Sequence, residues 1–331
     1  MKRILVVLIC LIFALSLTAC SGTSSDTPVV SDNNDISADA PNTSDTTDAE
    51  PADTDIATED NTETDDNNND VAEGSDDTAV ISFAPVTAVD NDHCSITITD
   101  IEPDNMWGYT LKATFENKSS DKNYMFSVYS AHINGVYCDP FFASEVAPGK
   151  KSVEEISFST DTLEENGIVD FTDIEITFHV SDYDDWTADL IADETVHVYP
   201  YGEDKATTFV REPQATDTIL ADNEYVTVII TDYYNDDIWG YTANMFIVNK
   251  TDKELMVSVE NASVNGYMAD PFFADSVMPG KCTFTSMSWS TDTFAEIGVT
   301  DVEEIELTLV VYDWNDWMSD RFVNETIILN P

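Results

Sequence analysis

The feature that most constrains the fold of this chain is an internal duplication. DPFFASEVAPGK at 139–150 is written again as DPFFADSVMPGK at 270–281, with nine of the twelve residues identical. Trp-Gly-Tyr-Thr at 107–110 likewise recurs at 239–242, 132 residues further on. Identity of this length does not arise by chance, so both segments must meet the same local structural requirement. The sequence therefore predicts two copies of one folding unit.

The match between the copies extends over more than a hundred residues. It contains a single one-residue loss in the second copy, after which the offset becomes 131, and both copies stop at a proline, Pro200 and Pro331. Each copy has about 110 residues, a common size for one domain. We name 81–200 repeat 1 and 221–331 repeat 2, and we name 201–220 the connector.

Within each copy, apolar and polar residues alternate with a period of two. This pattern is typical of antiparallel strands that bury one face, and Asn-Gly and Pro-Gly pairs between the runs indicate turns. About seven such strands per copy predict an all-β fold of two tandem immunoglobulin-like antiparallel β-sandwiches, with a small barrel as the alternative. The clearest apolar runs are Tyr109, Leu111, Ala113 and Phe115, then Ile174, Ile176, Phe178 and Val180, with Ile305, Leu307, Leu309 and Val311 in repeat 2.

In this scheme the duplicated DPFF segment connects two strands. Asp-Pro begins a bend, and Pro-Gly-Lys forms the next turn. We expect the paired phenylalanines to anchor the connection by packing on the core. A ligand-binding loop is the alternative interpretation. The four phenylalanines are Phe141 and Phe142 in repeat 1, and Phe272 and Phe273 in repeat 2.

The first twenty residues have the pattern of an exported protein. Two basic residues precede an apolar run at 4–17, which is too short for a comfortable membrane span but typical of a secretory signal. The run leads into Leu-Thr-Ala-Cys at 17–20, which resembles the lipobox of bacterial lipoprotein signal peptides. The resemblance implies that 1–20 is a lipoprotein signal peptide and that Cys20 carries the lipid that anchors the chain. An ordinary secretory cleavage site is the alternative.

Residues 21–80 differ in composition from everything that follows. They contain 18 of the 65 acidic residues and no Phe, Trp, Tyr, Lys or Arg. Such a segment cannot bury enough apolar surface to offset its conformational entropy, and repulsion between like charges extends it. We predict a disordered acidic linker that holds the repeats away from the membrane.

The layout as a whole resembles that of uncharacterised immunoglobulin-like surface lipoproteins of Gram-positive bacteria. The shared features are the signal, the lipobox, the acidic tether and tandem β-sandwich domains with Asn-Gly and Pro-Gly-Lys turns. The resemblance covers the full chain. It implies the fold and a lipid-anchored location on the extracellular face of the bacterial cytoplasmic membrane, and it implies no activity.

Comparison of the two copies argues against catalysis and against nucleic acid. None of the four histidines of repeat 1 has a histidine counterpart in repeat 2, so a His-based triad or metal site common to both copies is excluded. The sequence also lacks G-x-S-x-G, a Gly-rich phosphate loop and H-E-x-x-H. With 13 basic and 65 acidic residues, it repels nucleic acid. The histidine positions pair as His93 with Tyr225, His132 with Ser263, His179 with Val310, and His197 with Ile328.

An acidic loop near the end of each copy makes calcium a candidate ligand. Carboxylate and amide oxygens recur there at alternating positions, and Ca²⁺ binds six to eight oxygens. The Gly and the bidentate Glu of an EF-hand are missing, so a solvated acidic turn is the alternative. The candidate ligands are Asp182, Asp184 and Asp185 in repeat 1, and Asp313, Asn315 and Asp316 in repeat 2.

Two cysteines of repeat 1 suggest a disulfide. Cys94 aligns with Val226 and Cys138 with Ala269, so repeat 2 lacks both together, as the loss of a bonded pair would leave it. An extracellular location permits such a bond. We therefore predict a Cys94–Cys138 disulfide. Cys282 is left without a partner.

Four outward strand positions that are polar in repeat 1 are apolar in repeat 2. Phe246, Val248, Val310 and Ile328 replace two histidines, a threonine and a glutamate. They predict a binding patch, unless the connector or repeat 1 covers them. Trp314 is the tryptophan that we expect as an exposed, sugar-binding platform. Trp107 and Trp239 are expected to plug the ends of the sandwiches.

These patterns favour a non-catalytic binding or adhesion module on a lipid-anchored surface protein. Its partner is a surface protein, a wall polymer or a glycan. A passive envelope spacer without a specific ligand is the first alternative. The second is the substrate-binding lipoprotein of a transporter, although the long helices of two α/β lobes are missing from the pattern. No cofactor is expected beyond the calcium candidate.

Overall fold

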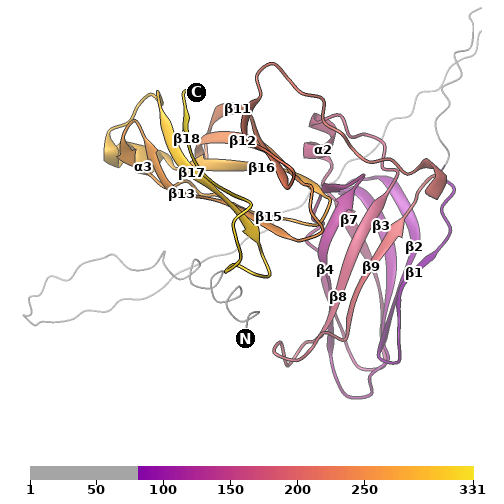
Figure 1. Cartoon of the computed structure of the whole chain (residues 1–331). Helices are drawn as coiled ribbons and strands as arrows, with labels where there is room; N and C mark the ends of the chain where they lie inside the picture. Colours follow the sequence, from indigo (N-terminus) through magenta and orange to yellow (C-terminus); the bar gives the residue numbers. More distant parts are fainter. Residues whose placement is uncertain (1–80) are drawn as a thin grey trace, which may run out of the picture. The chain divides into compact units, whose positions relative to one another are not determined.

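The computed structural model describes residues 81–331, and this part of the chain is all-β with several antiparallel sheets (Figure 1). The predicted signal peptide at 1–20, its lipidation site Cys20 and the predicted linker at 21–80 lie outside the described residues. No helix within 81–331 is both long enough and apolar enough to cross a membrane.

Repeat 1 consists of nine strands and one short helix, α2 (Asp161–Glu165). One sheet has the order β1-β2-β3-β7, and the other contains β5-β4-β8-β9 with β6 paired to β4. The sequence predicts about seven strands, and the two extra ones are the short β5 and β6. The strands are β1 (Val86–Asp90), β2 (Cys94–Asn105), β3 (Gly108–Asn117), β4 (Tyr124–Ile133), β5 (Val136–Tyr137), β6 (Ala143–Val146), β7 (Lys151–Phe158), β8 (Ile174–Asp182) and β9 (Ala192–Val198).

Repeat 2, together with the last three residues of the connector, has the same order of elements, with α3 (Thr291–Ile297) in the place of α2. Its strands β10-β11-β12-β16 continue through β5 into β5-β4-β8-β9 of repeat 1, so that one nine-stranded sheet, which includes β6, runs through both repeats. Its other sheet is β14-β13-β17-β18, with β15 paired to β13. The strands are β10 (Thr218–Asp222), β11 (Val226–Asp236), β12 (Gly240–Asn249), β13 (Leu255–Val264), β14 (Tyr267–Met268), β15 (Ala274–Val277), β16 (Cys282–Trp289), β17 (Ile305–Asp313) and β18 (Val323–Leu329).

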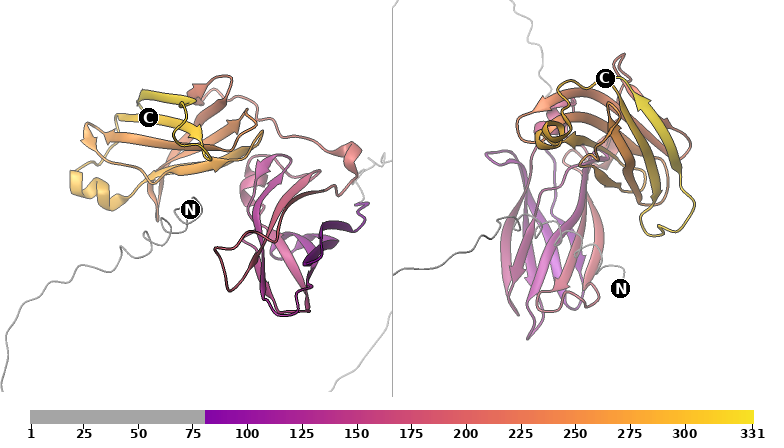
Figure 2. Two further views of the ribbon diagram at one scale, coloured as in Figure 1. Left: turned by 60° about the horizontal axis from the view of Figure 1, so that its bottom comes forward. Right: turned by 90° about the vertical axis from the view of Figure 1, so that its left-hand side faces the viewer.

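Each repeat has an apolar core, and the core of repeat 1 extends to Phe246 and Cys282 of repeat 2. The right-hand view of Figure 2 shows the two layers of strands of repeat 1. Phe115 on β3 lies 5.5 Å from Phe126 on β4 and 6.3 Å from Phe178 on β8, between ring centroids. Since β3 belongs to one sheet and β4 and β8 to the other, these rings join the layers. In repeat 2, Trp289 is buried where repeat 1 has Phe158. The predicted period-two alternation is confirmed, because the apolar positions of β3 and β8 are buried.

Both predicted Asn-Gly turns are formed. Asn134 and Gly135 have φ of 51° and 85°, and Asn265 and Gly266 have φ of 50° and 79°. Positive φ at both central residues matches the right-handed twist of a two-residue hairpin. The turn of repeat 1 also contacts the connector and repeat 2, because the backbone oxygens of Asn134 and Gly135 accept hydrogen bonds from them.

The two repeats meet through this turn and through the connector. Cys282 at the start of β16 pairs in parallel with Val136 of β5, and its N–H donates to the Gly135 oxygen at 3.1 Å. The connector includes a short 3-10 turn at Glu203–Lys205. Beyond that turn, the N–H of Phe209 donates to the Asn134 oxygen at 2.8 Å. The connector is thereby held against the outer face of the sheet that contains β16.

Candidate functional site

The aromatic residues of the two duplicated motifs meet on the surface of repeat 2. Trp239 follows β11 and Phe272 precedes β15. Their rings are stacked, with centroids 5.9 Å apart and planes at 16°. Trp239 is 56% exposed and Phe272 is 69% exposed. We name this stacked pair the aromatic platform. The Trp-Gly-Tyr-Thr and DPFF motifs thus contribute to one surface feature.

Backbone hydrogen bonds fix both halves of the platform. The carboxylate of Asp236 accepts from the N–H groups of Ile238 and Trp239 at 2.7 and 2.8 Å. Phe272 exchanges backbone hydrogen bonds with Ser288 of β16, at 2.7 and 3.3 Å. Both aromatic residues therefore stand on the ends of core strands, and such support makes a binding surface more precise than a free loop does.

Repeat 1 exposes the same two residues. Trp107 is 68% exposed and Phe141 is 93% exposed. The carboxylate of Asp139 accepts from the Phe141 N–H at 2.7 Å and holds the residue at a φ of 48°. Positive φ is unusual for a bulky side chain, and such outliers concentrate at functional sites.

These observations correct two predictions about aromatic side chains. Trp107 and Trp239 do not plug the ends of the sandwiches, because both are more than half exposed. In each DPFF segment only the second phenylalanine packs on the core. Phe142 stacks on the buried Phe115 at 5.1 Å, and Phe273 is partly buried against the core of repeat 2.

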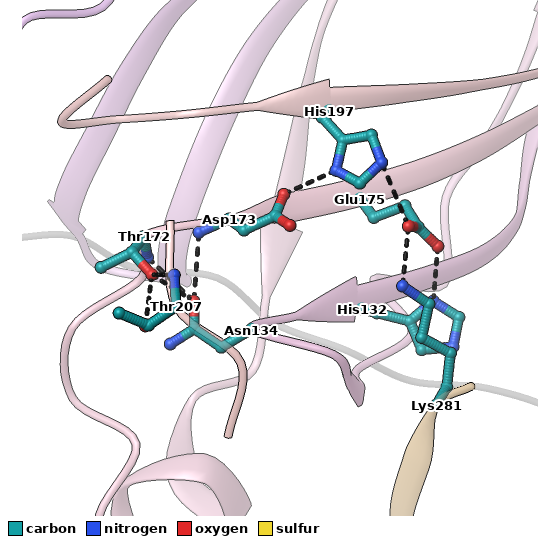
Figure 3. Close-up of polar contacts among 8 residues, drawn as sticks. All are labelled: His132, Asn134, Thr172, Asp173, Glu175, His197, Thr207 and Lys281. Carbon is teal, nitrogen blue, oxygen red and sulfur yellow. Dashed lines mark hydrogen bonds and ion pairs between the residues drawn. The ribbon is translucent and has the colours of Figure 1, made fainter. Parts of the chain in front are cut away.

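A polar network joins repeat 1 to Lys281, which precedes β16 (Figure 3). Glu175 on β8 is its centre. One carboxylate oxygen accepts from Lys281 Nζ at 2.7 Å and lies 3.2 Å from His197 Nε2. The other lies 3.6 Å from His132 Nδ1. His197 Nδ1 is 2.7 Å from the Asp173 carboxylate.

His132 is the buried member of this network. Its side chain is 3% exposed, and its Nδ1 makes no hydrogen bond within the described part of the chain. Burial, assisted by the nearby Lys281 ammonium and opposed by Glu175, lowers the pKa of His132 to about 4. The imidazole is therefore neutral at pH 7. The network joins β8 of repeat 1 to Lys281 and so contributes to the contact between the two repeats.

The calcium candidates are not assembled into a site. Asp182 accepts from Lys122 Nζ at 2.6 Å, and Asp313 accepts from Lys253 Nζ at 2.8 Å. In each case the lysine hydrogen bond lowers the pKa of the carboxyl. Within 81–331, no three His, Cys, Asp or Glu side chains are grouped as metal ligands would be. In each repeat, one of the carboxylates that we expected to bind calcium is thus paired with a lysine. The remaining candidates, Asp184, Asp185, Asn315 and Asp316, lie in exposed turns after β8 and β17.

The predicted Cys94–Cys138 disulfide is wrong. All three cysteines of the described chain are free. Cys94 pairs with Asn117 at one end of β3, whereas Cys138 Sγ lies 3.4 Å from the oxygen of Ser159 near the other end. The eight residues between these ends of β3 span about 27 Å, and a disulfide needs Cα atoms within about 7 Å. Joint absence from repeat 2 was therefore no sign of bonding.

Reducing agent is expected to leave the thermal stability of the chain unchanged, because no disulfide joins Cys94 to Cys138. The check is the melting temperature with and without dithiothreitol under otherwise identical conditions. Burial also raises the pKa of Cys138 and of Cys282 to about 12, so both thiols should alkylate slowly at pH 8. A melting temperature several degrees lower in dithiothreitol would indicate that the Cys94–Cys138 disulfide does form.

The predicted apolar patch is also not formed as expected. Phe246 and Val310 are buried, Val248 is half-buried, and only Ile328 is exposed, at 57%. Phe246 lies beneath Phe209 of the connector, with centroids 6.2 Å apart. The connector thus covers Phe246, which the sequence analysis named as the alternative to an exposed patch.

The choice of Trp314 as the exposed platform is not supported either. Trp314 is half-buried, whereas Trp186 and Trp317 in the same pair of loops are 65% and 61% exposed. The platform residues are identical in the two copies, but so are buried residues such as Val180 and Val311. Identity between the copies alone therefore does not distinguish the platform from the core.

Comparisons with known proteins identify no family. No family model matches the chain, and no curated protein matches it. Among solved structures, similarity is found to the YadV chaperone, with a TM-score of 0.21, 8% identity, and coverage of 66% of this chain and 92% of that one. For the red sea bream transglutaminase the TM-score is 0.20 and the identity 10%, with coverage of 73% of this chain and 31% of that one. For a protein of unknown function from Porphyromonas gingivalis W83 the TM-score is 0.20 and the identity 11%, with coverage of 75% of this chain and 100% of that one. Scores this low carry no argument about function.

Proposed function

We propose that this chain is a lipid-anchored protein of the bacterial cell surface that binds an envelope glycan without catalysis. In this proposal its two immunoglobulin-like repeats stand on an acidic linker and contact the ligand through the exposed Trp and Phe of the duplicated motifs. The lipobox-like segment at 17–20 and the composition of 21–80 support the location.

The observation that carries the proposal is the aromatic platform of Trp239 and Phe272. Exposed, contiguous aromatic surface lowers solubility and marks interaction sites when it is held in place. The apolar C–H face of a sugar ring packs on such aromatic faces, and aromatic residues dominate binding energy at interfaces. The presence of the same residues in repeat 1 would allow two contacts with one polymer.

The negative charge of the protein limits which class of glycan it can bind. Residues 81–331 contain 47 acidic and 11 basic residues. Such an excess of negative charge repels anionic polymers and favours neutral or cationic ones. A neutral glycan strand therefore fits the proposal better than a phosphate-rich wall polymer does. A transporter's binding lipoprotein is disfavoured, because residues 81–331 are all-β and form no pair of α/β lobes.

Replacing both Trp239 and Phe272 by alanine is expected to weaken glycan binding at least about thirtyfold, since loss of even one aromatic anchor costs about 2 kcal/mol or more. The test is co-sedimentation of the full-length protein in detergent with purified wall glycan and with insoluble neutral polysaccharides. Trp186→Ala is the matched control, because it removes an equally exposed tryptophan outside the platform. Unchanged binding by the double variant would contradict the aromatic platform as the binding site, and no binding by the wild type would favour the passive spacer.

A further inference from the structure

A cavity of about 470 Å³ lies where the connector crosses the outer face of the sheet β10-β11-β12-β16. Its floor includes Ile229, Phe246 and Val248, and the connector residues 208–217 form the opposite wall. A volume of roughly 300–1,000 Å³ with mainly apolar walls and a few polar groups is typical of small-molecule sites.

The apolar floor is specific to repeat 2. The corresponding face of repeat 1 carries Glu116, whose carboxylate pairs with Lys151 at 3.1 Å. Repeat 2 has Val248 and Cys282 at these two positions. Where repeat 1 has an ion pair that faces solvent, repeat 2 has apolar side chains that the connector partly covers. The cover is incomplete, because Val210 and Ile219 line the cavity and remain 77% and 61% exposed.

The charged side chains of the cavity are arranged unlike those of the rest of the surface. Three cations and two carboxylates line it, and Glu175, which pairs with Lys281, supplies a third carboxylate beside it. The charges around the cavity are therefore balanced, whereas 81–331 has 47 − 11 = 36 excess negative charges. Arg211 is paired in a bidentate manner with Asp217 at 2.7 Å. Lys250 donates to Asp222 at 2.7 Å and to the Asn223 oxygen at 2.8 Å.

Donors remain for a ligand. An ammonium group has three N–H donors. Lys281 uses one of its three on Glu175 and Lys250 uses two of its three, counting partners within 81–331. One anionic group could therefore accept the remaining N–H donors of Lys250 and Lys281, in a place where the charges of the protein are balanced. The hydrocarbon of the same ligand would cover the apolar floor.

We propose that this cavity binds a small amphiphile that has a short hydrocarbon chain and one anionic group, such as a medium-chain carboxylate. The chain lies against Phe246 and Val248, and the anionic group faces the ammonium groups of Lys250 and Lys281. This site is distinct from the aromatic platform, and the proposal does not depend on the glycan-binding function.

The test is calorimetric titration of the full-length protein in detergent with octanoate, 1-octanol and octylamine. Partition into detergent differs between the probes, so each titration is corrected by the same titration into protein-free detergent. We expect one octanoate per chain, bound at least tenfold more tightly than 1-octanol, and no binding of octylamine. Equal affinity for all three probes, or no octanoate binding, overturns the proposal.

Two variants locate the bound probe. Val248→Glu restores the acidic residue of repeat 1 on the cavity floor and is expected to weaken octanoate binding at least tenfold. Lys250→Met is expected to weaken octanoate at least fivefold and to leave 1-octanol unchanged. Melting curves verify that each variant is folded.

The chain supplies a matched control for the lysine. Lys118 donates to Asp90 at 2.7 Å and to the Asn91 oxygen at 2.8 Å in repeat 1, just as Lys250 does in repeat 2, but it does not line the cavity. Lys118→Met should leave octanoate binding unchanged, and so should Trp239→Ala. If Lys118→Met weakens octanoate binding as much as Lys250→Met does, the cavity is not the site.

Discussion

Gly240→Ala is expected to lower the free energy of unfolding of repeat 2 by about 2–5 kcal/mol. A Cβ atom at this position would lie 2.2 Å from the Trp289 carbonyl oxygen and 2.9 Å from the Thr291 nitrogen. Both are backbone atoms, so neither can rotate away. Gly240 also has a φ of 83°, which side chains disfavour. The start of β12 would have to separate from the end of β16, where Tyr241 pairs with Trp289.

Gly266→Ala is the matched control. Gly266 has nearly the same φ, 79°, but nothing lies within 4 Å of the added Cβ. Its cost should be the backbone strain alone, about 1–2 kcal/mol. Urea unfolding followed by tryptophan fluorescence measures both, because Trp289 is buried in the core of repeat 2. Equal losses in the two variants would show that the close approach of β12 to β16 contributes nothing.

This glycine connects stability to the proposed binding surface. Its close approach to β16 lies next to the aromatic platform, as do the hydrogen bonds of Asp236 and of Phe272. Gly108 makes the same approach in repeat 1, where a Cβ would lie 2.1 Å from the Phe158 oxygen. In both repeats the glycine of the Trp-Gly dipeptide permits the close strand pairing, and the tryptophan that precedes it is exposed.

The sequence predicted those parts of the fold that depend on local pattern. Alternation identified the buried face of β3 and β8, and the Asn-Gly pairs identified both hairpins, because period and turn chemistry act over a few residues. The exposed face of Phe141 was not predictable in this way. It lies in a loop, where no period tells which of two adjacent phenylalanines faces the core.

Long-range contacts account for the other errors. The burial of Phe246 depends on Phe209, which is 37 positions earlier and belongs to an irregular segment. The separation of Cys94 from Cys138 depends on strand direction along β3, which their joint absence from repeat 2 does not reveal. Comparison of the copies identified the positions that differ, and only the structure shows what covers them.

Acidification is expected to destabilise the chain through His132. Its pKa is about 4 in the folded protein, against about 6.5 when unfolded. Between these values the unfolded chain binds more protons, so the free energy of unfolding falls as the pH falls through this window. The full contribution is about 3 kcal/mol and is reached below pH 4. Above pH 6.5 it is absent.

The groups that face His132 determine what its protonation does. Glu175 on β8 attracts the imidazolium, Tyr137 on β5 lies 6.0 Å away between ring centroids, and Lys281 ahead of β16 repels it. Since Lys281 belongs to repeat 2 and is bonded to Glu175, protonation of His132 weakens the contact between the repeats. The acid response should therefore begin at this contact.

His132→Ser, which installs the residue found at Ser263 of repeat 2, separates this effect from the titration of the carboxylates. The measurement is urea unfolding of wild type and variant at pH 7 and at pH 4.5. The wild type should lose up to about 3 kcal/mol more than the variant. His93→Tyr, which copies Tyr225 at an exposed position, should follow the wild type. Parallel pH profiles for wild type and His132→Ser would mean that His132 is not the buried base that its surroundings indicate.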